Sequence, residues 1–161
     1  MDDFDFKNQR VLVIDDSSAM RKMLQITVQS LTQEVRQRLI EAGYEHREAN
    51  TRDHVPLGED DAPRLWAKFC FVQPAGQRRA HIHVRVAGNP NQRYPLLFRD
   101  YLRTHPEDAQ RYAALKYTLA EKFREDREAY TEAKGPFIWE VLRKAGHWSQ
   151  GVGWEPGPSD A

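Results

Sequence analysis

The sequence predicts an α+β fold, with a small mixed or antiparallel sheet that is covered by a long N-terminal helix and a helical C-terminal segment. Three observations support this prediction. Residues 10–14 form an unbroken apolar run, which is typical of a buried strand. Within residues 78–86, apolar and polar side chains alternate from His81 to Val86, as in a strand with one buried face. After residue 95 the apolar residues recur at helical spacing, so strands precede helices along the chain.

Composition bounds the class of protein. The chain has 161 residues, of which 40% are hydrophobic and 30% charged, enough for one domain with its own core. Lys+Arg and Asp+Glu both number 24, which argues against a general nucleic-acid or membrane-surface binder. The single Cys70 excludes an internal disulfide and a cysteine-rich zinc site. No apolar run is long enough to span a membrane, and the acidic start is unlike a signal peptide, so we expect a cytoplasmic protein.

The front of the chain predicts one strand and one long helix. The strand covers residues 10–14, and Ser17 or Ser18 is the expected N-cap of the helix. Apolar residues then recur every three or four positions up to Gly43, where a glycine suits the end of a helix. Because such a helix is long for a small domain, a break near residues 30–32 is an alternative.

The middle of the chain predicts a small sheet. A short edge strand is expected at residues 44–47, followed by a polar loop that ends at Pro63. Residues 64–73 are rich in aromatic and apolar side chains and predict a second strand. Turn residues 74–77 then lead into the strand that ends at Val86, and the last two strands form an antiparallel hairpin.

The rest of the chain predicts three helices. Pro95 suits the first turn of a helix that ends at Arg103, and Thr104 is the expected N-cap of the next helix. A third helix is expected from about Asp126 to Ala145, with a kink or break at Gly135-Pro136.

Glycine and proline residues near the end predict a flexible tail over residues 149–161. This leaves a single domain over residues 1–148.

The strand predicted within residues 78–86 carries the best candidate for a binding site. His81, His83 and Arg85 share its polar face, Arg79 follows on the same side, and Lys68 lies on the preceding strand. Imidazole and guanidinium groups can bind an anion such as a nucleotide phosphate. Two histidines without a third local ligand are a weak metal signal. A purely structural role for the histidines is an equally open alternative.

Two acids form the second candidate. Asp15 and Asp16 follow the first strand, and carboxylates at the open end of a strand suit Mg²⁺. The alternative is that Asp16 only caps the following helix. Asp15 could join the histidines as a third ligand if the two strands are neighbours.

Other polar residues have simpler expected roles. Cys70 lies between two phenylalanines and is expected to be buried and inert. In the first C-terminal helix, Arg99 is expected to pair with an acid and Tyr101 to pack on the sheet. Lys116 and Lys134 are expected to be solvated or in ion pairs.

Five sequence blocks, in order along the chain, resemble the GrpB (UPF0157) family. The resemblance covers about residues 33–146 and implies the nucleotidyltransferase fold, in which a Gly-Ser turn and acidic residues hold a nucleotide phosphate and Mg²⁺. The Gly-Ser block of the family is absent here. The five blocks are His81-Ile-His-Val84, Leu97-Phe-Arg-Asp-Tyr-Leu102, Arg103-Thr-His-Pro106, Tyr112-Ala-Ala-Leu-Lys116 and Asp126-Arg-Glu-Ala-Tyr-Thr-Glu-Ala-Lys134.

The front segment resembles a different family. Residues 8–31, with the sequence Arg10-Val-Leu-Val-Ile-Asp-Asp-Ser-Ser-Ala-Met-Arg21 at their centre, look like the first β-α unit of a response-regulator receiver domain. The later acceptor aspartate and lysine of a working receiver do not follow. The two resemblances together predict a chimera with its seam near residues 31–33, and a naturally divergent GrpB protein is the alternative.

Three functions are compatible with these observations. The first, which we favour, is a GrpB-like domain without catalysis. The second is a divergent Mg²⁺-dependent nucleotidyltransferase-like enzyme that uses Asp15, Asp16, His81, His83 and neighbouring arginines to bind a nucleotide or another small anion. The third is a module that binds a divalent ion without chemistry. Strand edges left open by missing elements would favour self-association.

Overall fold

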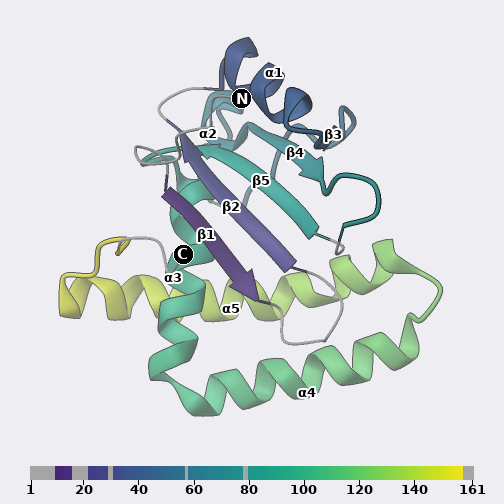
Figure 1. Cartoon of the computed structure of the whole chain (residues 1–161). Coiled ribbons are helices and arrows are strands. Elements are labelled where there is room, and N and C mark those ends of the chain that lie inside the picture. The colour runs from purple at the N-terminus through teal and green to yellow at the C-terminus, as the bar shows by residue number, and fades with distance from the viewer. Residues whose placement is uncertain (1–9, 16–21, 29–30, 57, 78–79, 158–161) are drawn as a thin grey trace. The chain divides into compact units, whose positions relative to one another are not determined.

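The computed structural model combines helices and strands as the sequence predicts (Figure 1), and it describes residues 10–15, 22–28, 31–56, 58–77 and 80–157. The described residues separate into two compact units between Arg93 and Tyr94, with Gly157 in the first unit and the second ending at Pro156. Each unit is considered by itself below. None of the described helices is both long enough and apolar enough to cross a membrane.

The first unit contains a mixed five-stranded sheet, in the order β1-β2-β5-β4-β3. The strands are β1 (Arg10–Asp15), β2 (Lys22–Val28), β3 (Glu45–His46), β4 (Lys68–Val72) and β5 (Ala80–Val86). β2 runs parallel to β5, and the other neighbouring strands are antiparallel. In Figure 1, β1 and β2 lie side by side at one edge of this sheet. The predicted hairpin of β4 and β5 and the short edge strand β3 are confirmed.

The predicted long N-terminal helix is wrong. Residues 22–28 form strand β2, and only α1 (Gln33–Glu41) is helical in this part of the described chain. The apolar residues of the segment 22–28 fit both the helical and the strand period. Pairing with β1 and β5 supplies backbone hydrogen bonds that favour the strand. Helix α1 begins after Thr32, whose Oγ1 accepts a hydrogen bond of 3.2 Å from the backbone N–H of Val35.

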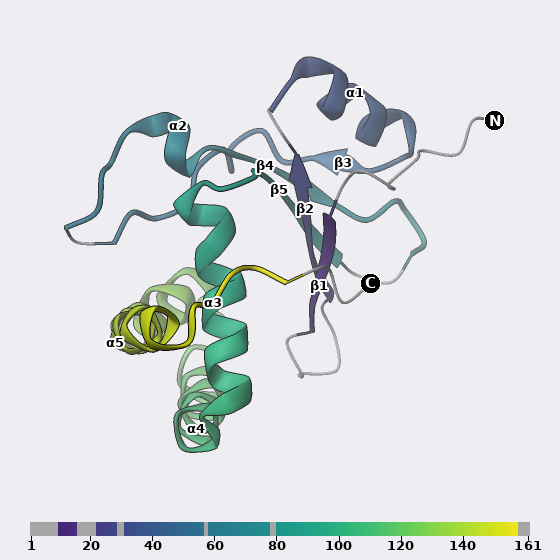
Figure 2. The same ribbon diagram turned by 90° about the vertical axis from the view of Figure 1, so that its left-hand side faces the viewer.

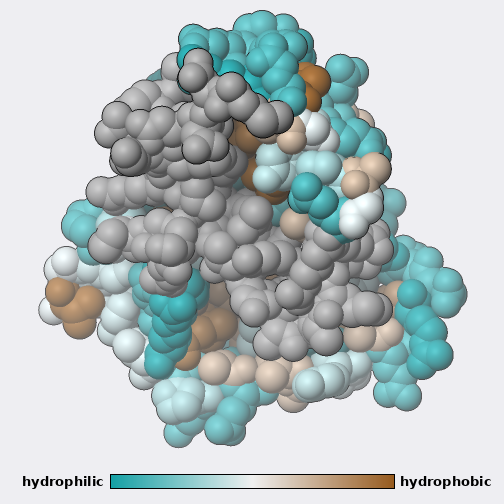
Figure 3. All heavy atoms as spheres, in the orientation of Figure 1, coloured by the Kyte–Doolittle hydropathy of each residue, from teal (hydrophilic) through white to brown (hydrophobic). Residues whose placement is uncertain are grey.

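One face of the sheet packs against α1 and forms the core of the first unit. Leu39, Phe71, Ile82 and Val84 are almost fully buried together. Ile82 and Val84 are the apolar positions of the alternating strand, so the alternation predicted the buried face correctly. The opposite side of α1 is charged, and it lies at the hydrophilic top of the surface in Figure 3.

A short helix replaces the start of the second predicted strand. The sequence predicts a strand from residue 64, but α2 (Pro63–Trp66) precedes β4. Proline is well suited to the first turn of a helix because it has no N–H to leave unpaired. Trp66 is then held in place by a hydrogen bond of 2.7 Å from its Nε1 to the backbone oxygen of Asp60.

The second unit is helical. Helix α3 (Pro90–Thr104) begins in the first unit, and α4 (Pro106–Lys122) and α5 (Arg127–Val152) follow it. Figures 1 and 2 show α4 and α5 side by side, joined by a short turn. The buried residues of this unit are Leu97, Tyr101, Val141 and Ala145, with Phe98, Leu102, Phe137, Trp148 and Trp154 packed around them.

Two helix starts differ from the prediction. Helix α3 starts at Pro90 instead of Pro95, because the backbone oxygen of Asn89 accepts hydrogen bonds from the N–H groups of Gln92 and Arg93. The N-cap of α4 is His105 rather than Thr104. The Thr104 hydroxyl instead donates to the backbone oxygen of Tyr101 at 3.0 Å, at the end of α3.

Helix α5 is longer and more continuous than predicted. It begins after Asp126, as predicted, and the side chain of Asp126 accepts a hydrogen bond of 2.9 Å from the N–H of Ala129. It then runs unbroken through Pro136 to Val152, beyond residue 149, where the flexible tail was expected to begin. Gly153 ends it in the left-handed conformation, and Trp154 packs back onto the helices. Whether residues 1–148 act as one domain stays a prediction.

Candidate functional site

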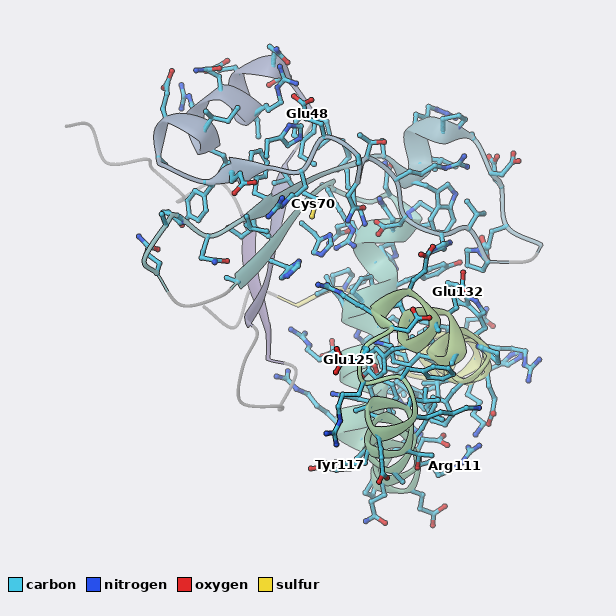
Figure 4. All side chains as sticks on the ribbon, turned by 90° about the vertical axis from the view of Figure 1, so that its right-hand side faces the viewer. Glu48, Cys70, Arg111, Tyr117, Glu125 and Glu132 are labelled. Carbon is cyan, nitrogen blue, oxygen red and sulfur yellow. The ribbon has the colours of Figure 1, made fainter. Side chains whose placement is uncertain are left out.

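The polar face of the β4–β5 hairpin gathers most of the predicted site residues that the structure describes. Lys68 pairs with Arg85, and Cys70 pairs with His83, across the antiparallel ladder. Because residues directly opposite one another share a face of the sheet, these four side chains lie on one side of it, away from the Phe71 and Ile82 core. Figure 4 shows Cys70 on this hairpin. All four side chains are buried.

Asp53 lies at the centre of this face and was not predicted as a site residue. Its Oδ1 accepts from Lys68 Nζ at 2.7 Å and from Arg85 Nη2 at 3.0 Å, and its Oδ2 accepts from Arg85 Nε at 2.8 Å. Asn91 Nδ2 donates to the same Oδ2 at 3.1 Å. The carboxylate therefore receives four hydrogen bonds, three of them from cations. We call Asp53, Lys68, Arg85 and Asn91 the Asp53 network.

Backbone pairing positions Asp53. Arg52 forms a bridge with Ala67, and the N–H of Asp53 donates to the backbone oxygen of Trp66 at 2.9 Å. The loop thereby extends the sheet beyond β4 and brings the carboxylate to Lys68. Asn91 is fixed in turn by a second hydrogen bond, of 3.0 Å, to the backbone oxygen of Ala67.

Charge keeps Asp53 ionised. Burial is the largest single influence and raises the pKa of this carboxyl. The hydrogen bonds and positive charges of Arg85 and Lys68 together outweigh burial, so the pKa lies well below its ordinary value. At neutral pH the network holds two cations and one anion.

His83 is neutral. Burial first, and then the charges of Arg85 and Lys68, lower the pKa of His83 to about 3. Its Nδ1 is buried and has no hydrogen-bond partner among the described residues. A neutral imidazole can accept or donate a hydrogen bond, but it adds no positive charge to an anion site.

Cys70 is buried, as predicted. Its Sγ lies 3.6 Å from Nδ2 of Asn50. Burial raises the pKa of the thiol, so it stays protonated at neutral pH and is a poor nucleophile.

The acidic candidates are not beside the histidines in the sheet. Strand β1 ends at Asp15, one residue beyond the predicted end, and β2 lies between β1 and β5. Asp15 pairs with Lys22, which pairs with Ala80. Strand spacing therefore separates the Asp15 and Ala80 backbones by about 10 Å. The condition under which Asp15 could join the histidines, that the two strands are neighbours, is therefore not met.

Some predicted site residues are not characterised by the structure. Asp16 and Arg79 lie outside the described residues, and of Asp15 only the backbone is described. His81 is partly exposed on β5, on the same face as His83. Among the described residues, no group of three or more His, Cys, Asp or Glu side chains is arranged to hold a metal ion.

The sequence signal for the two missed members of the Asp53 network was weak. Asp53 is one of several acids in a polar loop, and Asn91 stands in a turn-like Gly-Asn-Pro-Asn segment. Asp53 contacts Arg85, and Asn91 contacts Asp53, only because the folded chain brings distant segments together. Lys68 and Arg85 lie on two strands predicted to pair, and this was a usable signal for a missing acid. If such cations are buried in the sheet, they need an acid nearby.

A second polar network lies inside the helical unit. The Tyr101 hydroxyl donates to Asp108 Oδ2 at 3.1 Å, and Lys144 and Arg111 also donate to this carboxylate. Arg99 pairs with Asp100 at 2.6 Å, which confirms the predicted pairing with an acid. Tyr101 is buried among α3 and α5 residues and stacks on His105, and its packing on the sheet stays a prediction.

Comparison with known proteins identifies the family. Residues 23–144 match the sequence model of the GrpB protein family, so the chain belongs to the GrpB family. The match begins before the predicted seam near residues 31–33 and therefore includes strand β2.

Curated relatives fall into two groups. A dephospho-CoA kinase of Mycobacterium leprae is 34% identical over 142 residues, which is 81% of this chain and 35% of that protein. A UPF0157 protein of Pseudomonas aeruginosa is 44% identical over 74 residues, 46% of this chain and 30% of that protein. This chain thus spans about a third of the length of these relatives.

A solved structure shares the fold. The crystal structure of the conserved protein GrpB from Enterococcus faecalis has a TM-score of 0.64 and 22% sequence identity, and the match covers 88% of this chain and 84% of that one.

Proposed function

We propose that this chain is a GrpB domain of the nucleotidyltransferase-like fold that works without catalysis, as a folded accessory or binding module of a cytoplasmic protein. The observation that supports this most is the Asp53 network. Lys68 and Arg85 are the buried cations that a nucleotide phosphate would need, and both donate to an internal carboxylate at 2.7–3.0 Å. A phosphate could use them only by displacing Asp53, which would leave that buried carboxylate without its partners.

The relatives support a domain context for this proposal. The region similar to the mycobacterial dephospho-CoA kinases makes up 35% of those proteins. The Gly-rich loop followed by Lys and Ser or Thr, which holds phosphates in many kinases, does not occur in this sequence. We therefore propose that this chain resembles an additional domain of these relatives and does not carry out the kinase reaction.

A chimeric front segment is part of the same proposal. The receiver-like resemblance covers about residues 8–31 and overlaps the family match, which starts at residue 23, so the seam is proposed before residue 23 instead of near residues 31–33. Separate searches with residues 1–22 and 23–161 test it. Two unrelated sets of relatives are expected, and one set that spans both parts would refute the chimera.

Nucleotide binding is the decisive measurement for the accessory-module proposal. Thermal unfolding of the full chain would be followed with ATP, GTP and CTP, each with and without Mg²⁺. We expect that no nucleotide raises the Tm by binding to the polar face of the β4–β5 hairpin. A ligand at 100 times its Kd would add about 2.7 kcal/mol, a shift of several degrees. Such a shift, lost in His83→Gln and kept in the exposed-histidine control His54→Gln, would overturn the proposal.

The alternative is a divergent Mg²⁺-dependent nucleotide-binding enzyme, and one observation favours it. Two buried atoms, Nδ1 of His83 on β5 and Oδ1 of Asn91 at the start of α3, have no hydrogen-bond partner among the described residues. The Asn91 amide orientation is set by two acceptors of its Nδ2, so its Oδ1 is a true acceptor. A ligand that donates hydrogen bonds would satisfy both atoms. A Mg²⁺-dependent shift that disappears in Asp15→Asn would support this alternative.

A further inference from the structure

Unpartnered polar atoms gather on the face of the first unit's sheet that packs against α1. Nε of Arg36 and both ring nitrogens of His46 are covered by the protein and have no hydrogen-bond partner among the described residues. They are three of the five such side-chain atoms in the described part of the chain. A covered polar atom without a partner costs free energy, so this concentration requires an explanation.

The fold brings Arg36 and His46 to the same side of the sheet. His46 stands opposite Phe71 in the β3–β4 ladder, so the two side chains share a face, and their ring centres lie 4.9 Å apart. Phe71 packs with Leu39 of α1 in the buried core. Arg36 lies one turn before Leu39, on the same side of the helix. Figures 1 and 2 both show α1 beside β3. Burial first, and then the charge of Arg36, lower the pKa of His46, so its ring is neutral at pH 7.

Arg36 differs from the other arginines of the described chain. It is partly buried, and its guanidinium has no hydrogen bond or ion pair among the described residues. The other described arginines that are not exposed all have an interaction within the chain, and they are Arg85, Arg93 and Arg99. The Nη atoms of Arg36 are not among the covered atoms, so solvent reaches this end of the guanidinium. A partly buried cation with an accessible end is well suited to bind an external anion.

Charge and shape favour a carboxylate as that anion. A guanidinium can donate two parallel hydrogen bonds to a carboxylate, and a neutral imidazole adds one N–H donor. Arg36 supplies a single positive charge, and the negative charge of Glu48 also acts on His46, which disfavours a doubly charged phosphate. The partly buried ring of Phe69 meets the His46 ring edge-to-face at 5.7 Å and offers an apolar contact beside the polar atoms.

We propose that Arg36 and His46 form a binding site for the carboxylate of a small aromatic acid. The carboxylate accepts hydrogen bonds from the Arg36 guanidinium and from one ring nitrogen of His46, and Phe69 contacts the aromatic body of the acid. Because Nε is covered, the Arg36 side chain has to rotate as the acid enters. The site lies on the opposite face of the sheet from the Asp53 network, so it does not depend on the proposed function.

Titration with benzoate tests the site directly, and benzamide is the neutral ligand of the same shape. Binding to the full chain would be followed by two-dimensional NMR at pH 7 and constant ionic strength. Benzoate is expected to cause saturable shifts of backbone amide signals from α1 and β3. Benzamide is expected to bind at least about tenfold more weakly, because it lacks the charge that pairs with Arg36.

Arg36→Gln and His46→Phe are the test variants. Arg36→Gln removes the positive charge and is expected to weaken benzoate binding about tenfold or more. His46→Phe keeps an aromatic ring but removes both nitrogens, so an expected loss of about fivefold reports the hydrogen bond and not the packing. Arg38→Gln is the matched control, because Arg38 lies on the same helix, is exposed and pairs with Glu34 at 2.7 Å. The control is expected to stay within about twofold of the wild type.

Several results would overturn the proposal. It is wrong if benzoate shows no saturable binding, if benzamide binds as tightly as benzoate, or if His46→Phe binds like the wild type. It is also wrong if Arg38→Gln weakens binding as much as Arg36→Gln does. Inorganic phosphate that binds the same residues more tightly than benzoate would refute the carboxylate class. Far-UV circular dichroism checks the fold of each variant. Should Arg36→Gln fail to fold, Arg36→Lys keeps the charge without the planar fork and is expected to weaken binding about fivefold; unchanged binding by Arg36→Lys would then refute the site.

Discussion

Asp53 joins three separate parts of the first unit at a single residue. Its carboxylate receives hydrogen bonds from β4, from β5 and from the start of α3, and about four fifths of its side chain is buried. Removing the negative charge leaves Lys68 and Arg85 buried without a counter-charge, which is among the most costly changes a small domain can suffer.

Asp53→Asn is expected to lower the free energy of unfolding by about 3 kcal/mol. Urea unfolding at pH 7 measures this loss. Asp61→Asn, which changes an exposed carboxylate in the same loop, is the control and is expected to change stability by less than about 0.5 kcal/mol. Equal stability of Asp53→Asn and the wild type would show that the network contributes nothing.

His83 predicts a second, pH-dependent effect. The pKa of His83 is about 3 in the folded chain and about 6.5 in an unfolded one. The unfolded chain therefore binds more protons below pH 6.5, and stability falls as the pH falls. From pH 7 to pH 5 this residue alone is expected to remove about 2 kcal/mol.

Urea midpoints of the wild type and His83→Gln at pH 7 and pH 5 check this prediction. The variant should lose much less stability than the wild type over this interval, and the exposed-histidine variant His54→Gln should behave like the wild type. A wild type and a His83→Gln variant that lose equal stability would show that His83 is not buried in the neutral form.

At the scale of elements, α5 shows how glycine depends on its position. Gly135 lies within the helix, and a Cβ added there would meet Trp139 Nε1 at 3.9 Å, an ordinary contact. Gly153 ends the helix at a φ of 62°, in the left-handed region. The same substitution is therefore expected to have opposite effects at the two positions.

Gly135→Ala is expected to stabilise the chain by about 0.5–1 kcal/mol, because alanine loses less backbone entropy on forming a helix. Gly153→Ala is expected to destabilise it by about 1 kcal/mol, because a side chain is strained in the left-handed conformation. Thermal or urea unfolding of the two variants measures both. Two changes of the same sign would contradict the described end of α5.

The helices and strands also show which parts of the sequence were sufficient to predict their own secondary structure. The alternation over residues 80–86 predicted the hairpin and its buried face, because Ile82 and Val84 can share a face only in a strand. The helix expected to run up to Gly43 was wrong because Met23, Leu24, Ile26 and Val28 fit either period. Pairing with a strand more than fifty residues later decided between them.

The candidate site was only partly predictable for the same reason. Lys68, His83 and Arg85 were found because strand alternation places them on one face. Asp53 was missed because its contact with Arg85 joins residues 32 positions apart and depends on a loop of irregular structure. The resemblance to GrpB identified the family from local blocks of sequence, but such blocks carry no information about which carboxylate neutralises a buried cation.

At the scale of the whole molecule, each compact unit has its own buried cluster. Leu39, Phe71, Ile82 and Val84 form one, and Leu97, Tyr101, Val141 and Ala145 form the other. Val84 and Val141 are both completely buried, so they provide a matched pair of probes, one for each cluster.

Val84→Ala and Val141→Ala are each expected to lower the stability of their own unit by about 2 kcal/mol, from lost burial and a residual cavity. Hydrogen exchange followed by mass spectrometry resolves the two units. Val84→Ala should speed exchange mainly in the described residues up to 93, and Val141→Ala mainly in residues 94–156. Equal acceleration in both units by either variant would mean that the chain unfolds as a single cooperative body.

The position of β1 has a consequence for how this fold tolerates change. It is one of the two edge strands of the described sheet and pairs only with β2 among the described strands, through an antiparallel ladder of main-chain groups. Main-chain pairing is largely indifferent to the amino acids that carry it. A segment of different sequence at this edge can therefore keep the same main-chain ladder to β2.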